Sequence, residues 1–306
     1  MIVDKIYGVF NNLFKLKIFN FKLFNITPGD VAEFIYKKYC STYHNLEEII
    51  EIKVNDQIPF KMQCNASRGY TDIKLIWDKI YEAEITQLFP LLIDSQNVFI
   101  DIGANIGYYT MLAAKSLLAK GECYAFEPVL TTFNVLNRNV EINNLSNVTT
   151  FRVAGGSEKG TLTINISKES GLNSIVRKKR IQKKYPTELI AVDRIDRILK
   201  IQNKDVLIKI DTEGYEFESI KGLKNITDKN RCRIIFEYTP TFYSFFNKEI
   251  FSYCNDFMYY LANNGFIIYK IGKNGIDGEI SDIKSFIKLN GNLQTTLFAV
   301  NKNARE

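Results

Sequence analysis

A short run of small residues gives the first sign of chemistry in this sequence. The stretch NVFIDIGANIGYYTMLAA, residues 97–114, joins an apolar run to a helix-like run through Gly103 and Gly107. Glycine lets the backbone turn sharply and approach a ligand closely. Asn105 tolerates a left-handed backbone and offers a side-chain amide. Asp101 stands two residues before the first glycine, so we expect a ligand-binding turn with a carboxylate beside it.

The glycine pattern argues against a dinucleotide as that ligand. The dinucleotide fingerprint G-x-G-x-x-G fails here at two of its three glycines. A carboxylate at Asp101 would repel a pyrophosphate but would suit a positive, amino-acid-like group. The sequence therefore disfavours a dehydrogenase and favours S-adenosylmethionine, which carries a sulfonium and an amine but no phosphate.

Two further stretches predict contacts with the remainder of such a cofactor. Glu127 ends the next apolar run, 20 residues after Gly107, and an acid at this place typically accepts both ribose hydroxyls. The stretch VAGGSEKG follows the third run, and we expect Ala154 to Ser157 to lie along the adenine. The alternatives are a surface glutamate at a strand end and a simple turn.

Acidic residues gather after a fourth apolar run, in the stretch IKIDTEGYEFESIKG. Asp211 stands at the carboxyl end of that run, and Glu213 and Glu216 follow within one turn. Glu237 ends the fifth run and should lie on the same rim. Lys209 should point to the same face of a regular strand as Asp211. Acids are also favoured at a helix N-terminus by its dipole, which is the structural alternative.

The elements that must position these residues follow from the alternation of apolar runs and helical patterns after residue 97. The predicted strands are 97–102, 122–127, 148–154, 206–211, 231–238, 266–271 and 295–302, and the predicted helices are 107–119, 131–144, 215–223 and 248–265. This alternation predicts an α/β fold with a mostly parallel sheet and helices on both faces. We also expect a hairpin within 51–64, one helix over 75–92, and an insertion at 160–199 with an extra strand or two.

The stretches FIDIGANIGYYT, FEP and IKIDTEGYE, in this order, resemble the FkbM-type methyltransferases over roughly residues 75–240. The resemblance implies a class I methyltransferase Rossmann-like fold, with a seven-stranded sheet whose last strand is antiparallel. It implies methyl transfer from S-adenosylmethionine, most often to a hydroxyl oxygen of a sugar or secondary metabolite. We expect a helical or mixed N-terminal extension or cap over 1–74 and the methyltransferase domain over 75–306.

The resemblance also implies roles for individual residues. The cofactor loop would comprise Asp101, Gly103, Ala104, Asn105 and Gly107. Glu127 would be the ribose acid, and Asp211, Glu213 and Glu216 would form the acidic motif after the fourth strand.

Removal of the proton from an acceptor hydroxyl calls for a nearby base. The single histidine, His44, precedes the cofactor motifs, so we expect a carboxylate base instead. Asp211 is the first candidate, with Glu213 and Glu237 behind it. These acids would also permit a divalent metal that lowers the pKa of the hydroxyl, although no spacing requires one.

Composition places this chain of 306 residues among ordinary soluble globular proteins, with 46% hydrophobic and 24% charged residues. Its net charge of +6 does not by itself indicate nucleic acid. Five cysteines without a C-x-x-C pair favour a reducing cytosol over a disulfide framework or a zinc site. The sequence shows no signal-peptide pattern and no apolar run long enough to span a membrane.

Several partners stay open at this point. Segment 1–26 has an apolar helical face and many lysines, which suits packing on the domain or on a second copy, or peripheral contact with the inner membrane face. The basic stretch 177–184 favours an alternative RNA methyltransferase, although it lacks interleaved aromatics for base stacking. A non-catalytic membrane- or partner-binding scaffold is the other alternative. We expect a cytoplasmic protein with a sugar or small-molecule acceptor.

Overall fold

The computed structural model of the chain describes residues 47–55, 58–93, 98–117, 121–166, 186–240, 248–272, 275–290 and 295–301. The chain divides into two compact units, 1–45 and 46–306. Segment 1–26, His44 and the basic stretch 177–184 lie outside the described residues. Among the described helices, none combines the length and the apolar character that crossing a membrane requires.

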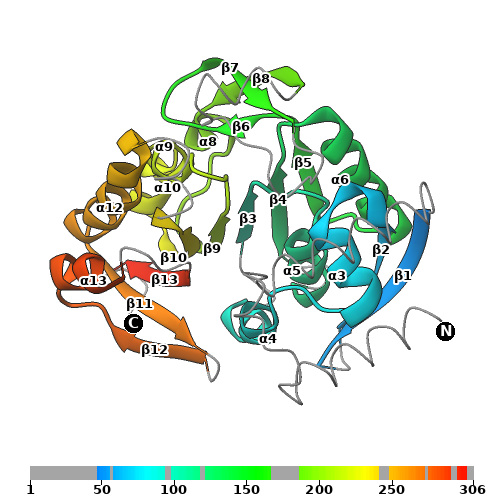
Figure 1. Ribbon diagram of the computed structural model, residues 1–306, viewed down its shortest axis with the longest axis horizontal. Helices are drawn as coiled ribbons and strands as arrows, with labels where there is room; N and C mark the ends of the chain where they lie inside the picture. Colours follow the sequence, from blue (N-terminus) through cyan, green and yellow to red (C-terminus); the bar gives the residue numbers. More distant parts are fainter. Residues whose placement is uncertain are drawn as a thin grey trace, which may run out of the picture. The chain divides into compact units, whose positions relative to one another are not determined.

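The second unit is built around one large sheet (Figure 1). Its strands are β3 (Val98–Ile102), β4 (Glu122–Phe126), β5 (Val148–Phe151), β9 (Asp205–Ile210), β10 (Arg231–Tyr238), β11 (Phe266–Gly272), β12 (Gly275–Glu279) and β13 (Thr295–Asn301). Their order across the sheet is β12-β11-β13-β10-β9-β3-β4-β5. The seven predicted strands are confirmed, and β12 adds an eighth by pairing antiparallel with β11.

The direction of the strands brings the predicted site residues to one edge. β3 pairs parallel with β4 on one side and with β9 on the other, and β13 runs antiparallel to β10, as the resemblance implies. The chain moves outward from β3 through β4 to β5 and then returns to β9 beside β3. Open parallel sheets bind ligands at such a reversal, outside the carboxyl ends of the strands.

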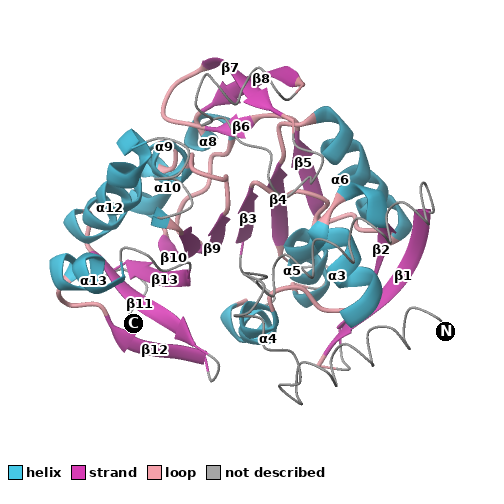
Figure 2. Cartoon of the chain, viewed as in Figure 1, coloured by secondary structure: helices cyan, strands magenta, loops and turns pink. Residues whose placement is uncertain are grey.

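Helices cover both faces of the sheet, as predicted (Figure 2). One face packs against α4 (Ala83–Leu92), α5 (Tyr108–Ser116) and α6 (Leu130–Ile142), and the other against α8 (Ile195–Ile198), α9 (Glu216–Lys221), α10 (Lys224–Lys229), α12 (Lys248–Asn263) and α13 (Ile283–Asn290). Successive residues point to opposite faces, so Phe99 packs on the first side, and Ile100 on the second. Burial on both sides explains why the strands are continuous apolar runs.

A hairpin precedes the sheet, as predicted, and packs against its first face. β1 (Glu47–Val54) and β2 (Ile58–Asn65) pair antiparallel, and the 3-10 turn η2 (Ala66–Arg68) and α3 (Tyr70–Asp78) follow. The side-chain oxygens of Asn139 on α6 and of Asn143, which caps its C-terminus, accept hydrogen bonds from the N–H groups of Gln63 and Lys61, both at 2.7 Å. The hairpin therefore belongs to the compact unit that contains the sheet.

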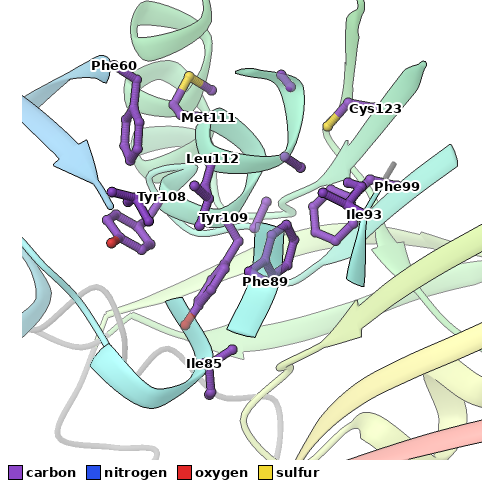
Figure 3. Close-up of a cluster of buried hydrophobic side chains, with 14 of the residues drawn as sticks. Phe60, Ile85, Phe89, Ile93, Phe99, Tyr108, Tyr109, Met111, Leu112 and Cys123 are labelled. Atoms are coloured by element: carbon purple, nitrogen blue, oxygen red, sulfur yellow. The ribbon is translucent and has the colours of Figure 1, made fainter. Parts of the chain in front are cut away.

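Aromatic side chains fix the start of α5 against this face (Figure 3). The ring centroid of Phe89 lies 5.1 Å from that of Phe99 and 5.4 Å from that of Tyr109. The neighbouring ring of Tyr108 lies 5.6 Å from Phe60 on β2. Because α5 begins directly after the glycine turn, this packing holds the turn in place.

The prediction of one helix over 75–92 is wrong, because the chain forms two helices there. α3 ends at Asp78 and α4 begins at Ala83, and between them Lys79 and Glu82 have left-handed backbones with φ of 56° and 43°. The Thr86 hydroxyl donates to the carbonyl of Tyr81 and stabilises the break. Helical periodicity continues through the break and could not reveal it.

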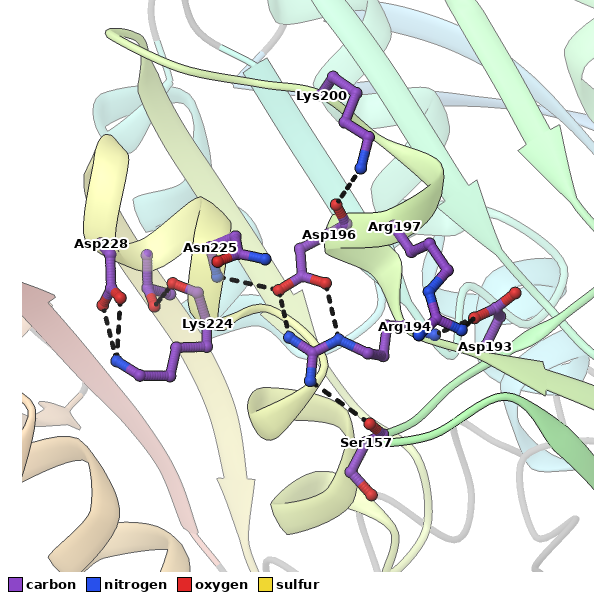
Figure 4. Close-up of polar contacts among 10 residues, drawn as sticks. Ser157, Asp193, Arg194, Asp196, Arg197, Lys200, Lys224, Asn225 and Asp228 are labelled. Atoms are coloured by element: carbon purple, nitrogen blue, oxygen red, sulfur yellow. Dashed lines mark hydrogen bonds and ion pairs between the residues drawn. The ribbon is translucent and has the colours of Figure 1, made fainter.

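The insertion contributes β7 (Gly160–Asn165) and β8 (Thr187–Asp193) to a small sheet of order β6-β8-β7, whose third strand is β6 (Ala154–Gly155), just before the insertion. The extra strands predicted there are confirmed. The chain then turns at an ion pair in which Arg194 binds Asp196 at 2.6 Å (Figure 4). Asp196 also accepts the N–H of Asn225 at 2.9 Å, which ties the end of the insertion to α10.

Candidate active site

A pocket lies at the carboxyl ends of β3, β4 and β9. It is lined by the glycine turn after β3, the Glu127 loop after β4, the short strand β6, and the Asp211 loop after β9. Side chains from the region of α3 and α4 complete its wall, among them Thr71 and Tyr81. The pocket therefore stands at the point where the strand order reverses.

Close packing between two loops requires the first glycine of the turn. Gly103 has φ of +82°, and a Cβ atom there would lie 1.8 Å from the carbonyl oxygen of Asp211. The N–H groups of Gly103 and Ala104 both donate to the carbonyl of Phe126 at 3.0 Å. Asn105 has the left-handed backbone that the sequence predicts, with φ of 51°. The turn thus joins the ends of three strands.

Glu127 is buried and is held by two backbone donors. Its carboxylate accepts the N–H of Asn105 at 3.0 Å and the N–H of Val129 at 2.9 Å. Burial raises the pKa of Glu127 to about 7, against the lowering effect of these hydrogen bonds. Each carboxylate oxygen can accept a second hydrogen bond, so the group can still receive hydroxyls of a ligand in the pocket.

Asp101 is buried on the floor of the pocket. Its carboxylate accepts the hydroxyl of Thr110 at 2.6 Å, and the register of β3 and β9 places it beside Lys209. Burial raises the pKa of Asp101 to about 6, while Lys209 acts to lower it. The turn therefore has an acid at its base, as predicted, and a cation supports that acid.

Lys209 is a buried cation surrounded by acids. Its ammonium lies 2.7 Å from the carboxylate of Asp211 and 4.8 Å from the ring centroid of Tyr109. The Tyr109 hydroxyl in turn donates to Glu82 at 2.7 Å. Burial lowers the pKa of Lys209, but Asp211, Glu82 and Asp101 outweigh it and raise the pKa overall. The prediction that Lys209 and Asp211 share a face is confirmed by their contact.

The three candidate catalytic acids meet at the edge of this pocket. Asp211, Glu213 and Glu237 each place a carboxylate oxygen within 4.8 Å of the others. Glu213 has a left-handed backbone with φ of 52°. Burial, and then repulsion from Asp211 and Glu237, raise the pKa of Glu213 well above its ordinary value. Three such oxygens form a donor set that suits a hard divalent cation.

Glu216 has a different role from the other acids of its motif. Its buried carboxylate accepts the N–H of Thr212 at 2.9 Å and the N–H of Gly214 at 3.1 Å. The side chain therefore folds back and holds the Asp211 loop in shape, and it is not among the residues that line the pocket.

Most of the predicted site residues lie together. Those that line the pocket are Asp101, Gly103, Ala104, Asn105, Glu127, Ala154, Asp211 and Glu213. Gly107 lies outside the lining and turns the chain into α5 with φ of +90°. Ser157 is also outside it; its hydroxyl donates to Glu218 and its carbonyl accepts from Arg194 (Figure 4).

Residues of the site that sequence reasoning missed include Thr71, Tyr81, Glu82, Tyr109 and Thr212. Thr71, Tyr81 and Tyr109 line the pocket, and Glu82 binds the Tyr109 hydroxyl. Thr71, Tyr81 and Glu82 precede the glycine turn by about 20 to 30 residues and have no motif of their own. Tyr109 lies two residues after Gly107, and this position next to the glycine turn is the signal in the sequence that could have identified it as a site residue.

Polar groups in this pocket fit the cofactor that the sequence favours. The side-chain oxygens of Asn105 and Thr212 are buried and have no hydrogen-bond partner in the described part of the chain. Both residues line the pocket, so a polar ligand would satisfy these atoms. With acids at Asp101 and Glu127, the lining suits a ligand that has hydroxyls and positive groups.

Comparison with known proteins agrees with the resemblance seen in the sequence. The model of the family described as "Methyltransferase FkbM domain" matches residues 101–268. Methyltransferase 1 of Beauveria bassiana (strain ARSEF 2860) is 28% identical over 171 residues, which cover 50% of this chain and 68% of that protein.

Solved structures show a weaker likeness. The crystal structure of a methyltransferase FkbM from Methylobacillus flagellatus KT is 14% identical with a TM-score of 0.39, covering 67% of this chain and 44% of that one. The O-methyltransferase TomG of Streptomyces achromogenes, solved with SAM, is 12% identical with a TM-score of 0.41, covering 70% and 76% of the two chains.

Proposed function

Because the chain belongs to the FkbM methyltransferase domain family, we propose that it transfers a methyl group from S-adenosylmethionine to a hydroxyl oxygen of a sugar or other small metabolite. The observation that carries this proposal is the pair formed by Lys209 and Asp211. The Lys209 side chain is 7% exposed and that of Asp211 is 23% exposed. The Asp211 carboxylate is therefore held by the buried Lys209 ammonium and remains accessible from the pocket.

Each end of the pocket would have its own task. Glu127 would receive the ribose hydroxyls, Ala154 and Gly155 would lie along the adenine, and Asp101 would face the positive amino-acid end. S-adenosylmethionine supplies an activated methyl group. The chain's contribution is to hold the acceptor hydroxyl in line with that group and to remove its proton. Asp211 would accept this proton, with Glu213 beside it.

A divalent cation is a second way for the same acids to act. Asp211, Glu213 and Glu237 would hold the ion, which would lower the pKa of a bound hydroxyl. The clustering of their oxygens within 4.8 Å supports this version.

The acidic rim favours a small neutral acceptor over RNA, because carboxylates at the site of transfer repel phosphates. We also propose that the enzyme is cytoplasmic. Segment 1–26 would contact the inner membrane face peripherally or would contact a second copy of the chain.

The first test is calorimetric titration with S-adenosylmethionine, with NAD as the control ligand. Release of S-adenosylhomocysteine would then be followed with a panel of free sugars, methyl glycosides and a structured RNA at 150 mM salt. We expect binding of S-adenosylmethionine alone, and turnover with a hydroxyl acceptor. Binding of NAD, or turnover with RNA only, would contradict the proposal.

The second test separates the base from the metal. Asp211→Asn should lower turnover by about 100-fold or more and leave cofactor affinity within about threefold. The matched control is Asp228→Asn, an exposed acid on α10 with its side chain 49% exposed. Loss of activity with EDTA, restored by Mg²⁺, would assign the acids to a metal. Full activity of Asp211→Asn would remove Asp211 from the mechanism.

A further inference from the structure

Two hydroxyl side chains enter the pocket from outside the main sheet. Thr71 lies in the first turn of α3 and is 6% exposed, and Tyr81 lies between α3 and α4. Both line the pocket, and both precede residues 101–268, which match the family model.

The Tyr81 hydroxyl is a donor at the β9 end of the pocket. Burial raises the pKa of Tyr81 far above its ordinary value, and Glu82 and Asp211 raise it further. Lys209 and a hydrogen bond from the Thr71 side chain lower the pKa by less. The phenol therefore keeps its proton. The residue after it, Glu82, accepts the Tyr109 hydroxyl at 2.7 Å, and the Tyr109 ring lies 4.8 Å from the Lys209 ammonium on β9, so Tyr81 belongs to the β9 end of the pocket.

Contacts with the core fix Tyr81 in this position before any ligand binds. The Tyr81 carbonyl accepts the Thr86 hydroxyl, and its ring centroid lies 5.9 Å from that of Tyr108. The next residue, Glu82, accepts the Tyr109 hydroxyl at 2.7 Å. With its backbone held at two points and its ring packed on Tyr108, Tyr81 can present its hydroxyl at a reduced entropic cost of ordering on binding.

The shape of the proposed cofactor indicates what these hydroxyls meet. With ribose at Glu127 and adenine at Ala154, the nucleoside occupies the β4 side of the pocket. The amino-acid chain must then continue past Gly103 toward β9. Its ammonium can face Asp101, but its carboxylate needs donors at an end that also contains Asp211.

We infer that Thr71 and Tyr81 form the subsite for the α-carboxylate of the cofactor, with Tyr81 donating the direct hydrogen bond. Lys209, the one cation among the described residues that line the pocket, supports the negative charge from below. This inference rests on the proposed function, because it needs a cofactor with an amino-acid end. It assigns part of the cofactor site to a segment ahead of the family match.

Two nucleosides that differ only in the amino-acid chain give a direct test. S-adenosylhomocysteine has this chain, whereas 5′-methylthioadenosine has the same adenosine and sulfur without it. Calorimetry would compare the full chain with Tyr81→Phe and Thr71→Val, which remove a hydroxyl at nearly constant volume. The matched control is Tyr70→Phe, since Tyr70 is 57% exposed and does not line the pocket.

We expect Tyr81→Phe to lower the affinity for S-adenosylhomocysteine by about tenfold or more, the usual effect of a lost hydrogen bond to a charged group. Thr71→Val should lower this affinity by less. Both variants should keep the affinity for 5′-methylthioadenosine within about twofold of that of the unaltered chain. Thermal unfolding would verify that each variant is folded.

Three outcomes would overturn this inference. An equal loss of affinity for both nucleosides would indicate that the substitution disturbs the whole pocket. Unchanged affinity for S-adenosylhomocysteine with reduced turnover would assign Tyr81 to the acceptor. Binding of neither nucleoside to the unaltered chain would overturn the proposed function as well, whereas the first two outcomes leave the proposed function standing.

Discussion

The two ends of the pocket hold their carboxylates in different ways. At the β4 end, Glu127 is bound by the backbone N–H groups of Asn105 and Val129 at 3.0 and 2.9 Å. At the β9 end, Asp211 is bound by the ammonium of Lys209 at 2.7 Å. Neutral donors set by the fold hold the first acid, whereas a single charged side chain holds the second.

Under the proposed function, this difference separates recognition of the cofactor from methyl transfer. Backbone donors remain as long as the turn is folded, so the β4 end of the pocket is formed by the fold itself. At the β9 end, Lys209 also lowers the pKa of the buried acid Asp101 and of the partly buried acid Glu82. One side chain therefore supports the charge of several acids, and the β9 end should be the more fragile of the two.

The largest effect should come from Lys209→Met, which removes that cation. Leaving buried carboxylates without their partner typically costs about 3–5 kcal/mol, and we expect a loss of this size in the free energy of unfolding at pH 8. Burial already raises the pKa of Asp101 and Glu82 with Lys209 present. Without the cation these pKa values rise further above those of the unfolded chain, so the penalty grows as pH rises and fades as pH falls.

Urea unfolding at pH 5.5 and pH 8 would measure both parts of this prediction. Lys224→Met is the matched control, because its pair with Asp228 is exposed, with side chains 51% and 49% accessible. Such a pair contributes about 0.5 kcal/mol or less. A loss for Lys209→Met that is no larger than this control, or that is the same at both pH values, would contradict the comparison.

A smaller effect should appear at the β4 end of the pocket, where Glu127→Gln should change the pH dependence of the free energy of unfolding. The pKa of Glu127 is raised from 4.5 in the unfolded reference to about 7 by burial. Stability from the protonated acid is therefore present below pH 4.5 and is lost as pH rises through 7. We expect the unaltered chain to lose about 2–3 kcal/mol between pH 5 and pH 8 through this group.

Glu127→Gln cannot ionise, so its free energy of unfolding should change less over this range. Urea unfolding at four pH values from 5 to 8 would give the difference between the two proteins. Glu141→Gln, at a 66% exposed side chain on α6, serves as the control. Parallel pH profiles for the unaltered chain and Glu127→Gln would show that backbone donors stabilise the ionised acid more than we infer.

The sequence predicts the backbone geometry of the β4 end of the pocket well because its determinants are local. Gly103 and Asn105 have backbone conformations that their residue types favour, and Glu127 follows directly from a buried strand. The strands themselves are visible because burial on both faces makes them apolar throughout. These features require no knowledge of what lies across the pocket.

The β9 end of the pocket depends on contacts between distant segments, so the sequence predicts it less completely. The break between α3 and α4 has no periodic signal, yet it brings Tyr81 into the pocket and Glu82 to Tyr109. Glu216 has the same spacing as a site acid, but its carboxylate binds the backbone of its own loop. Residue type and spacing place a side chain on a rim, and its partners then decide its role.

The smallest effect concerns Ser157, which the sequence places beside the adenine. The structure gives its hydroxyl another partner, Glu218, outside the pocket. Ser157→Ala should therefore cost about 1 kcal/mol in the free energy of unfolding, the usual contribution of one hydrogen bond, and should leave affinity for S-adenosylmethionine within about twofold. Chemical unfolding and calorimetry would measure the two quantities. A tenfold loss of affinity would mean that the cofactor draws Ser157 away from Glu218, so that the β4 end also relies on a side chain and the contrast between the two ends fails.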